Sequence, residues 1–328
     1  MTKANVQETS ATRCFTGNFG DIDQFSEATR GWDLDFRQLT PGRLDASLSV
    51  VIQPHARMEA SRFNQRFQQF GATPQGMRTF GVLERGIFGV NWYGRQISDA
   101  TLLYFHPTSG FEAVSQKEFD CYTLSFSEAQ LAEVSERLGL PDAHTFLGQN
   151  ETAHTFGNEL VADTRNRLRH IFDAVRSNPA IAEDPGLRNE MEQEIPSQLL
   201  SALSSITNEV PRPSIRSRRR TLEKAINLVN EQAAIPLTIA ELCGAVGVSW
   251  RTLDYAFKEH FGISPKRYLM AVRLNAVRKE LSSMPSRVTV ASVASRWGFW
   301  HMSQFAKEYK KFFGELPSET LNKKGTAQ

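Results

Sequence analysis

The sequence predicts an α+β N-terminal half, a sheet or small barrel packed with helices, followed by an all-α C-terminal half. Three observations support this: an internal repeat near the C-terminus, strand-like runs that give way to helical patterns, and a difference in charge between the halves. At 328 residues the chain is long enough for two domains with separate cores. We expect domains over residues 1–210 and 221–323, a basic proline-containing linker over 211–220, and helix-turn-helix units at about 239–261 and 290–313.

The repeat consists of two segments that share an apolar skeleton with three- and four-residue spacings, which is typical of amphipathic helices. A glycine divides each segment, Gly247 in the first and Gly298 in the second, where the chain must leave one helix and reverse. Gly262 and Gly314 close the second helices, and a proline follows each of them by three residues. Each copy therefore predicts a helix, a tight turn and a second helix.

The second helix of each copy has an outward polar face when it is projected at about 100° per residue. Cationic and hydrogen-bonding side chains on such a face can read base edges in the major groove of DNA. A solvated face would be the better explanation for a single basic helix, but the same arrangement in both copies favours DNA binding. The residues on or beside these faces are Arg251, Asp254, Tyr255, Lys258, Ser303, Gln304, Lys307, Lys310 and Lys311.

The two halves differ strongly in charge, which the net charge of +2 conceals. Residues 211–328 contain 20 Lys and Arg against 9 Asp and Glu, whereas residues 1–210 contain 18 against 27. Because phosphate neutralisation supplies much of the affinity of proteins for DNA, the basic half indicates a nucleic-acid-binding unit. The five arginines of the expected linker either contact the DNA backbone or are solvated.

The C-terminal third resembles the DNA-binding domain of the AraC/XylS-type bacterial transcription regulators. The resemblance covers about residues 222–321. Trp300, His301 and Tyr309 depart from the family pattern, in which a small polar pair and a phenylalanine are commoner. Within the family, the runs at residues 273–278 and 297–301 look closest to the ethanolamine-utilisation activators. The matching residues include Val248, Ser249, Leu253, Phe257, Lys258, Phe261 to Pro265, Trp297 to Phe299, Phe305, Phe313, Gly314 and Pro317.

The resemblance implies seven helices, with two recognition helices that enter successive major-groove segments and a helix at about residues 265–281 that joins them. It also implies a cupin-like, ligand-sensing N-terminal half, with double-stranded DNA, RNA polymerase, a small-molecule effector and a second copy of the chain as partners. By position, it assigns base reading to Arg251, Asp254, Tyr255, Ser303, Gln304 and Lys307, and phosphate contacts to Lys258, Lys310 and Lys311.

The N-terminal half has strand-like patterns followed by helical ones, which indicates an α+β domain. The helix expected at residues 159–175 presents apolar residues among charges, and this face either forms a dimer contact or packs on its own sheet; its members are Leu160, Leu168, Ile171 and Val175. The strands are expected at 43–53, 79–83, 86–93, 101–106 and 120–126, and the helices at 127–138, 152–177 and 185–208.

Five side chains on or beside these strands would suit an apolar ligand pocket with a few polar groups, although such aromatics more often belong to a core. They are Phe88, Trp92, Tyr93, Tyr104 and His106. His55 and His106 lack the close spacing that brings two ring nitrogens to one metal, so we expect neither a metal nor a cofactor.

Enzymatic activity is not expected, because no phosphate-binding glycine loop, nucleophile elbow or zinc-protease motif occurs. The specific enzymatic alternative is a DNA-repair methyl acceptor, which needs an exposed, activated thiolate. Cys14, Cys121 and Cys243 have neither metal-site nor disulfide spacing and are expected to be reduced core residues. No apolar run is long enough for a signal peptide or a spanning helix, so a cytoplasmic location is expected.

Taken together, these features predict a sequence-specific transcription regulator, an activator under small-molecule control. The alternative is a regulator whose N-terminal half binds a partner protein instead of a metabolite.

Overall fold

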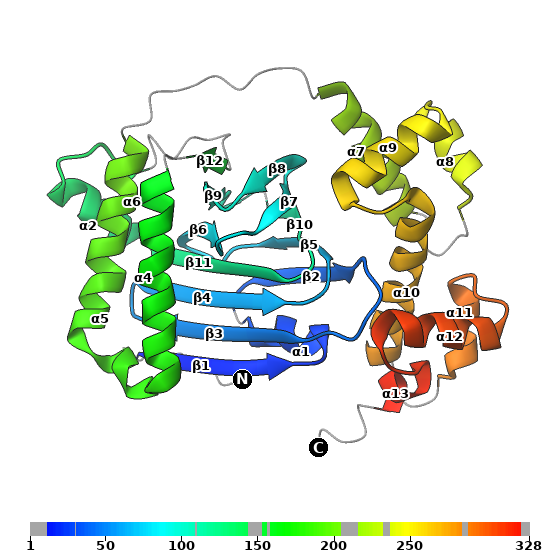
Figure 1. Ribbon diagram of the computed structural model, residues 1–328, viewed down its shortest axis with the longest axis horizontal. Helices are drawn as coiled ribbons and strands as arrows, with labels where there is room; N and C mark the ends of the chain where they lie inside the picture. Colours follow the sequence, from blue (N-terminus) through cyan, green and yellow to red (C-terminus); the bar gives the residue numbers. More distant parts are fainter. Residues whose placement is uncertain are drawn as a thin grey trace, which may run out of the picture.

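Two antiparallel sheets face each other in the N-terminal part, with helices on one outer side and the C-terminal helices on the other (Figure 1). The computed structural model describes residues 12–29, 31–108, 110–143, 153–155, 158–204, 216–231, 237–283 and 288–322. The seven-stranded sheet has the order β1 (Arg13–Phe19), β3 (Ala46–Ile52), β4 (Ala56–Phe63), β11 (Phe119–Ser127), β6 (Met77–Leu83), β9 (Thr101–Phe105) and β12 (Ala153–Thr155). The five-stranded sheet has the order β2 (Asp33–Gln38), β5 (Phe67–Ala72), β10 (Phe111–Val114), β7 (Phe88–Trp92) and β8 (Arg95–Ser98).

The helices fall into two groups on opposite sides of the sheets (Figure 1). Those beside the seven-stranded sheet are α2 (Glu128–Arg137), α4 (Asn158–Ser177), α5 (Pro185–Asn189) and α6 (Ile195–Ser204), with a 3₁₀ turn at Pro179–Glu183 and a π turn at Glu190–Glu194; α1 (Ile22–Ala28) precedes β2. The C-terminal group comprises α7 (Arg216–Glu231), α8 (Ile239–Val246), α9 (Trp250–Phe261), α10 (Pro265–Ser283), α11 (Val290–Arg296), α12 (Met302–Phe313) and α13 (Pro317–Asn322).

The central strands of the seven-stranded sheet are buried on both faces, since successive side chains of a strand point to opposite sides and a core lies on each side. In β11, Cys121 packs in the core between the two sheets, whereas Tyr122 and Leu124 pack against the helices. The α+β prediction for this half is confirmed. The five expected strand regions appear as β3, β6, β7, β9 and β11, and the sequence pattern missed β1, β2, β4, β5, β8, β10 and β12.

Three expectations for the helical segments and the thiols need correction. The helix expected from residue 152 begins at Asn158, because Ala153–Thr155 pairs with β9 as a strand. The last five residues of the expected linker belong to α7, which begins at Arg216, and residues 211–215 lie outside the described part. Cys14 is exposed, so it is not a core residue.

The apolar face of α4 packs on its own sheet, which was the alternative to a dimer contact. Leu168, Ile171 and Val175 are buried in one core with the helix-facing side chains of the seven-stranded sheet. These three side chains are therefore not available to a second copy of the chain. None of the helices in the described ranges is both long and apolar enough to cross a bilayer.

Asp120, in β11, is a destabilising carboxylate at neutral pH. Its burial and the nearby charge of Glu84 raise its pKa to about 6. The folded protein therefore holds this proton more tightly than the unfolded chain, and ionisation costs stability as the pH rises through that value. We expect Asp120→Asn to raise the free energy of unfolding by about 1 to 3 kcal/mol at about pH 8, and by less at about pH 5. Urea unfolding at both pH values measures this, and an equal gain at both would contradict it.

Candidate functional site

The first helix-turn-helix unit consists of α8 and α9, and capping residues define both ends of α8 and the start of α9. The hydroxyl of Thr238 accepts a hydrogen bond from the backbone of Glu241, whose carboxylate accepts one in return, so α8 begins with a capping box. Gly247 ends α8 with a φ of 72°, a left-handed conformation that glycine adopts without strain. Ser249 then caps α9. The unit expected at about 239–261 forms for the reasons that its sequence indicates.

The outward face of α9 is exposed, as its periodicity predicts. Arg251 and Lys258 are exposed, and Tyr255 is 58% exposed, although such a large ring is usually covered. Asp254 is only half-buried, and its carboxylate lies 2.7 Å from the ammonium of Lys258 one turn later. The structure therefore joins a candidate base reader and a candidate phosphate contact in one ion pair, which partly screens the charge of the acid.

The second unit consists of α11 and α12 and presents a similar face. Its five candidates, Ser303, Gln304, Lys307, Lys310 and Lys311, are all exposed. The amide of Gln304 donates to Glu308 at 2.8 Å, which orients it along the helix. Two exposed indoles were missed as candidates: Trp250 opens α9, and Trp300, 73% exposed, lies in the turn before α12.

Helix α10 joins the two units through one shared core. Tyr268, Val272 and Leu281 of α10 are buried in the same cluster as Phe257 of α9 and Phe305 of α12. Because protein interiors are closely packed, this shared core fixes the position of the two recognition helices relative to each other.

The N-terminal domain holds the C-terminal ends of both recognition helices. The guanidinium of Arg66 donates to the carbonyl of Phe261 at 2.7 Å, in the last turn of α9. The amide of Gln38 and the backbone N–H of Gly42 each donate to the carbonyl of Phe312 at 2.9 Å, in the last turn of α12. These donors satisfy carbonyl groups that a helix end leaves without an internal partner. The outward faces of both helices stay exposed.

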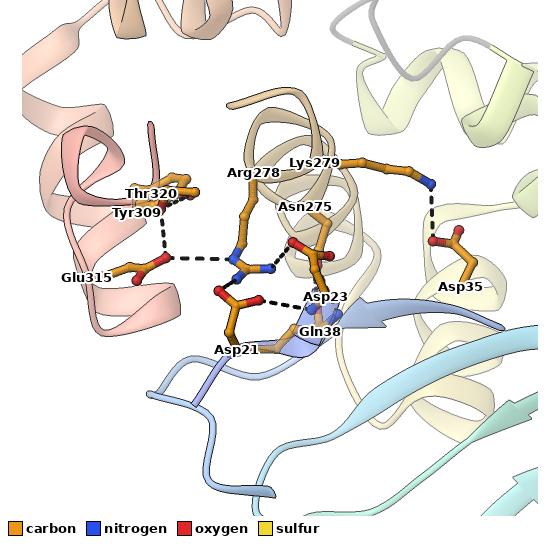
Figure 2. Close-up of polar contacts among 10 residues, drawn as sticks. All are labelled: Asp21, Asp23, Asp35, Gln38, Asn275, Arg278, Lys279, Tyr309, Glu315 and Thr320. Atoms are coloured by element: carbon orange, nitrogen blue, oxygen red, sulfur yellow. Dashed lines mark hydrogen bonds and ion pairs between the residues drawn. The ribbon is translucent and has the colours of Figure 1, made fainter. Parts of the chain in front are cut away.

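Helix α10 also binds the edge strand β2 directly (Figure 2). The side-chain amide of Asn275 accepts from the backbone N–H of Gln38 at 3.0 Å and donates to its carbonyl at 2.9 Å. It thus completes the hydrogen bonds of one residue at an otherwise open sheet edge. Next to it, Arg278 lies 2.6 Å from Asp21 and 3.2 Å from Asp23.

The five-stranded sheet has one face toward the C-terminal helices and the other toward a cavity. On the outer face, Arg37 of β2 and Gln68 of β5 both bond the hydroxyl of Tyr268, at 3.0 and 2.9 Å. On the inner face, Phe36 of β2 and Gln69 of β5 line a cavity between the two sheets. In both β2 and β5, one residue therefore contacts α10 and its neighbour in the strand lines the cavity.

Of the five side chains suggested for a ligand pocket, the structure places only Trp92 in the lining of this cavity. Tyr104 lies on the opposite face of its sheet, in the core under the helices, and Phe88 is 63% exposed. Tyr93 and His106 are outside the lining as well. The described residues contain no cluster of three His, Cys, Asp or Glu side chains that would suit a metal ion.

Residues 242–323 match a family model described as a helix-turn-helix domain. The probable thc operon regulatory protein of Rhodococcus erythropolis is 41% identical over 98 residues, which are 30% of this chain and 30% of that protein. The XylDLEGF operon transcriptional activator 2 of Pseudomonas putida is 31% identical over 129 residues, 39% of this chain and 80% of that protein. A solved structure of a probable AraC family transcriptional regulator from Rhodopseudomonas palustris CGA009 has 32% identity and a TM-score of 0.30, over 31% of this chain and 95% of that one.

The aligned region covers less than a third of the Rhodococcus protein, so that relative informs only one part of the chain. The match to the Pseudomonas protein, in contrast, extends over 80% of that relative at 31% identity. With the helix-turn-helix match, it confirms the resemblance seen in the sequence. The chain belongs to the AraC/XylS family of transcription regulators.

Proposed function

We propose that this protein is a sequence-specific, DNA-binding transcription regulator, and specifically an activator that acts in the cytoplasm on promoter DNA. The observation that carries the proposal is the pair of exposed recognition faces on α9 and α12, joined through the shared core around α10. Two such helices held about one turn of DNA apart can contact successive major-groove segments. The basic charge of the C-terminal part supports binding to the phosphate backbone.

Base reading is assigned to one set of exposed side chains and backbone contact to another. The ammonium groups of lysines bind phosphates without selecting a sequence, whereas the base readers must reach the base edges in the groove. The exposed indoles of Trp250 and Trp300 are suited to apolar contact with thymine methyl groups or sugars. The proposed base readers are Arg251, Asp254, Tyr255, Ser303, Gln304 and Lys307, and the proposed phosphate contacts are Lys258, Lys310 and Lys311.

Effector control is proposed to act through the five-stranded sheet. A ligand between the sheets would press on Phe36 and Gln69, whose neighbours Arg37 and Gln68 hold Tyr268 of the DNA-binding domain. A ligand shifts a conformational equilibrium only if it binds one state better than another, so the proposal requires a ligand that favours one arrangement of this contact. Contact with RNA polymerase, dimerisation and a closest relationship to the ethanolamine-utilisation activators remain predictions from the resemblance.

Arg251→Ala and Lys307→Ala are expected to weaken binding to the specific site by about 1 to 3 kcal/mol each, because each would remove a contact to a base edge. Footprinting on the DNA upstream of the protein's own gene identifies that site, and fluorescence anisotropy with specific and random duplexes measures both affinities. Lys310→Ala is the matched control: it should weaken binding to both duplexes alike and lower the salt dependence. Equal losses on both duplexes for Arg251→Ala would refute its role as a base reader.

A further inference from the structure

The cavity between the two sheets is lined mainly by apolar and aromatic side chains. Trp32, Phe36, Trp92, Phe105 and Phe111 form much of its wall. An apolar pocket with a few convergent polar groups is the usual form of a small-molecule site. The polar groups then determine which molecules are accepted.

One polar group of the lining is a buried carboxylate. Glu59, in β4, is 3% exposed and forms an ion pair with Arg57 two residues earlier. The same carboxylate oxygen accepts a hydrogen bond from the indole of Trp32 at 3.1 Å. Burial raises the pKa of Glu59, and the guanidinium of Arg57 opposes this shift. Arg57 is thus matched by a carboxylate, so an anionic ligand would meet the acid without a spare cation to receive it.

Two further polar groups of the lining are donors without a bond in the protein. The amide nitrogen of Gln69 and the hydroxyl of Thr123 are buried, and neither has a hydrogen-bond partner among the residues that the structure describes. Thr123 in β11 is paired in register with Glu59 in β4, and Gln69 lines the cavity from the other sheet. Buried polar atoms normally have partners, so this pair indicates a ligand that supplies an acceptor.

We propose that this cavity binds an uncharged molecule with one aromatic ring and an amide-like group. The acceptor oxygen of that group receives hydrogen bonds from Gln69 and Thr123, and its N–H donates to Glu59. The ring packs among the aromatic side chains, where offset and edge contacts are favourable. That this molecule is an effector rests on the proposed regulatory function, whereas the binding chemistry does not.

Benzamide and benzoate provide the test, because they have nearly the same shape and differ in charge. Isothermal titration calorimetry of the full chain near neutral pH is expected to show benzamide binding at least about tenfold more tightly than benzoate, because a like charge beside Glu59 is unfavourable. Gln69→Leu and Thr123→Val should each lower the affinity for benzamide several-fold. Glu59→Gln should reduce or reverse the preference for benzamide over benzoate, because Arg57 then lacks its carboxylate partner and can bind the benzoate anion. Gln69→Leu and Thr123→Val keep the test valid if Glu59→Gln does not fold.

The proposal is overturned if benzoate binds as tightly as benzamide or if benzamide does not bind. It is also overturned if Gln69→Leu and Thr123→Val both bind benzamide as tightly as the wild-type protein does. These titrations contain no DNA, so they are independent of the proposed regulatory function. That function fails separately if the wild-type protein gives no footprint on any upstream DNA, with or without benzamide. A footprint that benzamide leaves unchanged, together with tight benzamide binding, would support the site and reject the gating.

Discussion

Replacement of Arg278 by alanine is expected to lower the free energy of unfolding by about 3 to 5 kcal/mol, because it leaves the largely buried carboxylates of Asp21 and Glu315 without their cation. The Arg278 side chain is 7% exposed and forms ion pairs with Asp21 at 2.6 Å and Asp23 at 3.2 Å. It also lies 3.8 Å from Glu315, in the segment between α12 and α13 (Figure 2). Its guanidinium lies over the ring of Phe313. Arg278 therefore links both domains and the last two helices at one point.

Urea unfolding followed by tryptophan fluorescence measures this loss. Lys279→Ala is a matched control from the next position, since Lys279 also faces a carboxylate of the N-terminal domain, Asp35, at 3.3 Å. That pair is solvated, with the lysine side chain 73% exposed, so its loss should change stability by less than about 1 kcal/mol. Similar effects for the two variants would show that burial of Arg278 does not determine its contribution.

The second large effect is expected for Gly314→Ala, with a loss of about 2 to 4 kcal/mol in the free energy of unfolding. Gly314 ends α12 with a φ of 79°, which costs alanine energy in any surroundings. An added Cβ would also lie 2.7 Å from the Cβ and 3.1 Å from the Cα of Arg43, in the N-terminal domain. Relief requires movement of the backbone next to Gly42, whose N–H bonds the end of α12.

Gly247→Ala separates these two causes. Gly247 has a similar φ of 72°, and no described atom lies within 4 Å of the position of an added Cβ. Its replacement should therefore cost only the conformational term of about 1 to 2 kcal/mol. Denaturant midpoints of both variants, measured under one condition, give the comparison. If Gly314→Ala costs no more than Gly247→Ala, the contact with Arg43 contributes nothing to domain docking.

The helix-turn-helix pair could be predicted from the sequence because its signals are local. The positive φ values of the four turn and end glycines and the burial of Leu253 and Phe305 follow from spacing alone. The outward faces of α9 and α12 followed by the same argument. The pairing of Asp254 with Lys258 did not, although their four-residue separation on a helix is a usable signal for such an ion pair.

The strands that carry the domain contact could not be predicted in this way. In β2, Asp35 and Arg37 read as solvent-facing, yet they bond α10 and α7, whose residues lie more than 190 positions later. The residues predicted for a ligand pocket differ from the lining of the cavity for a related reason. Tyr104 and Phe105 are adjacent in β9 and both are buried, so periodicity does not say which faces the cavity, and the structure selects Phe105.

The two faces of the five-stranded sheet limit how this chain can be recombined with its relatives. A hybrid that takes its N-terminal half from one regulator and its C-terminal half from another would separate Arg37 and Gln68 from Tyr268, and Gln38 from Asn275. Such a hybrid would lose the hydrogen bonds between the five-stranded sheet and α10, through which the two halves of the chain meet. The halves of this protein are therefore exchangeable only together with these few residues of α10, and a change in the residues of β2 or β5 that face α10 must be matched on that helix.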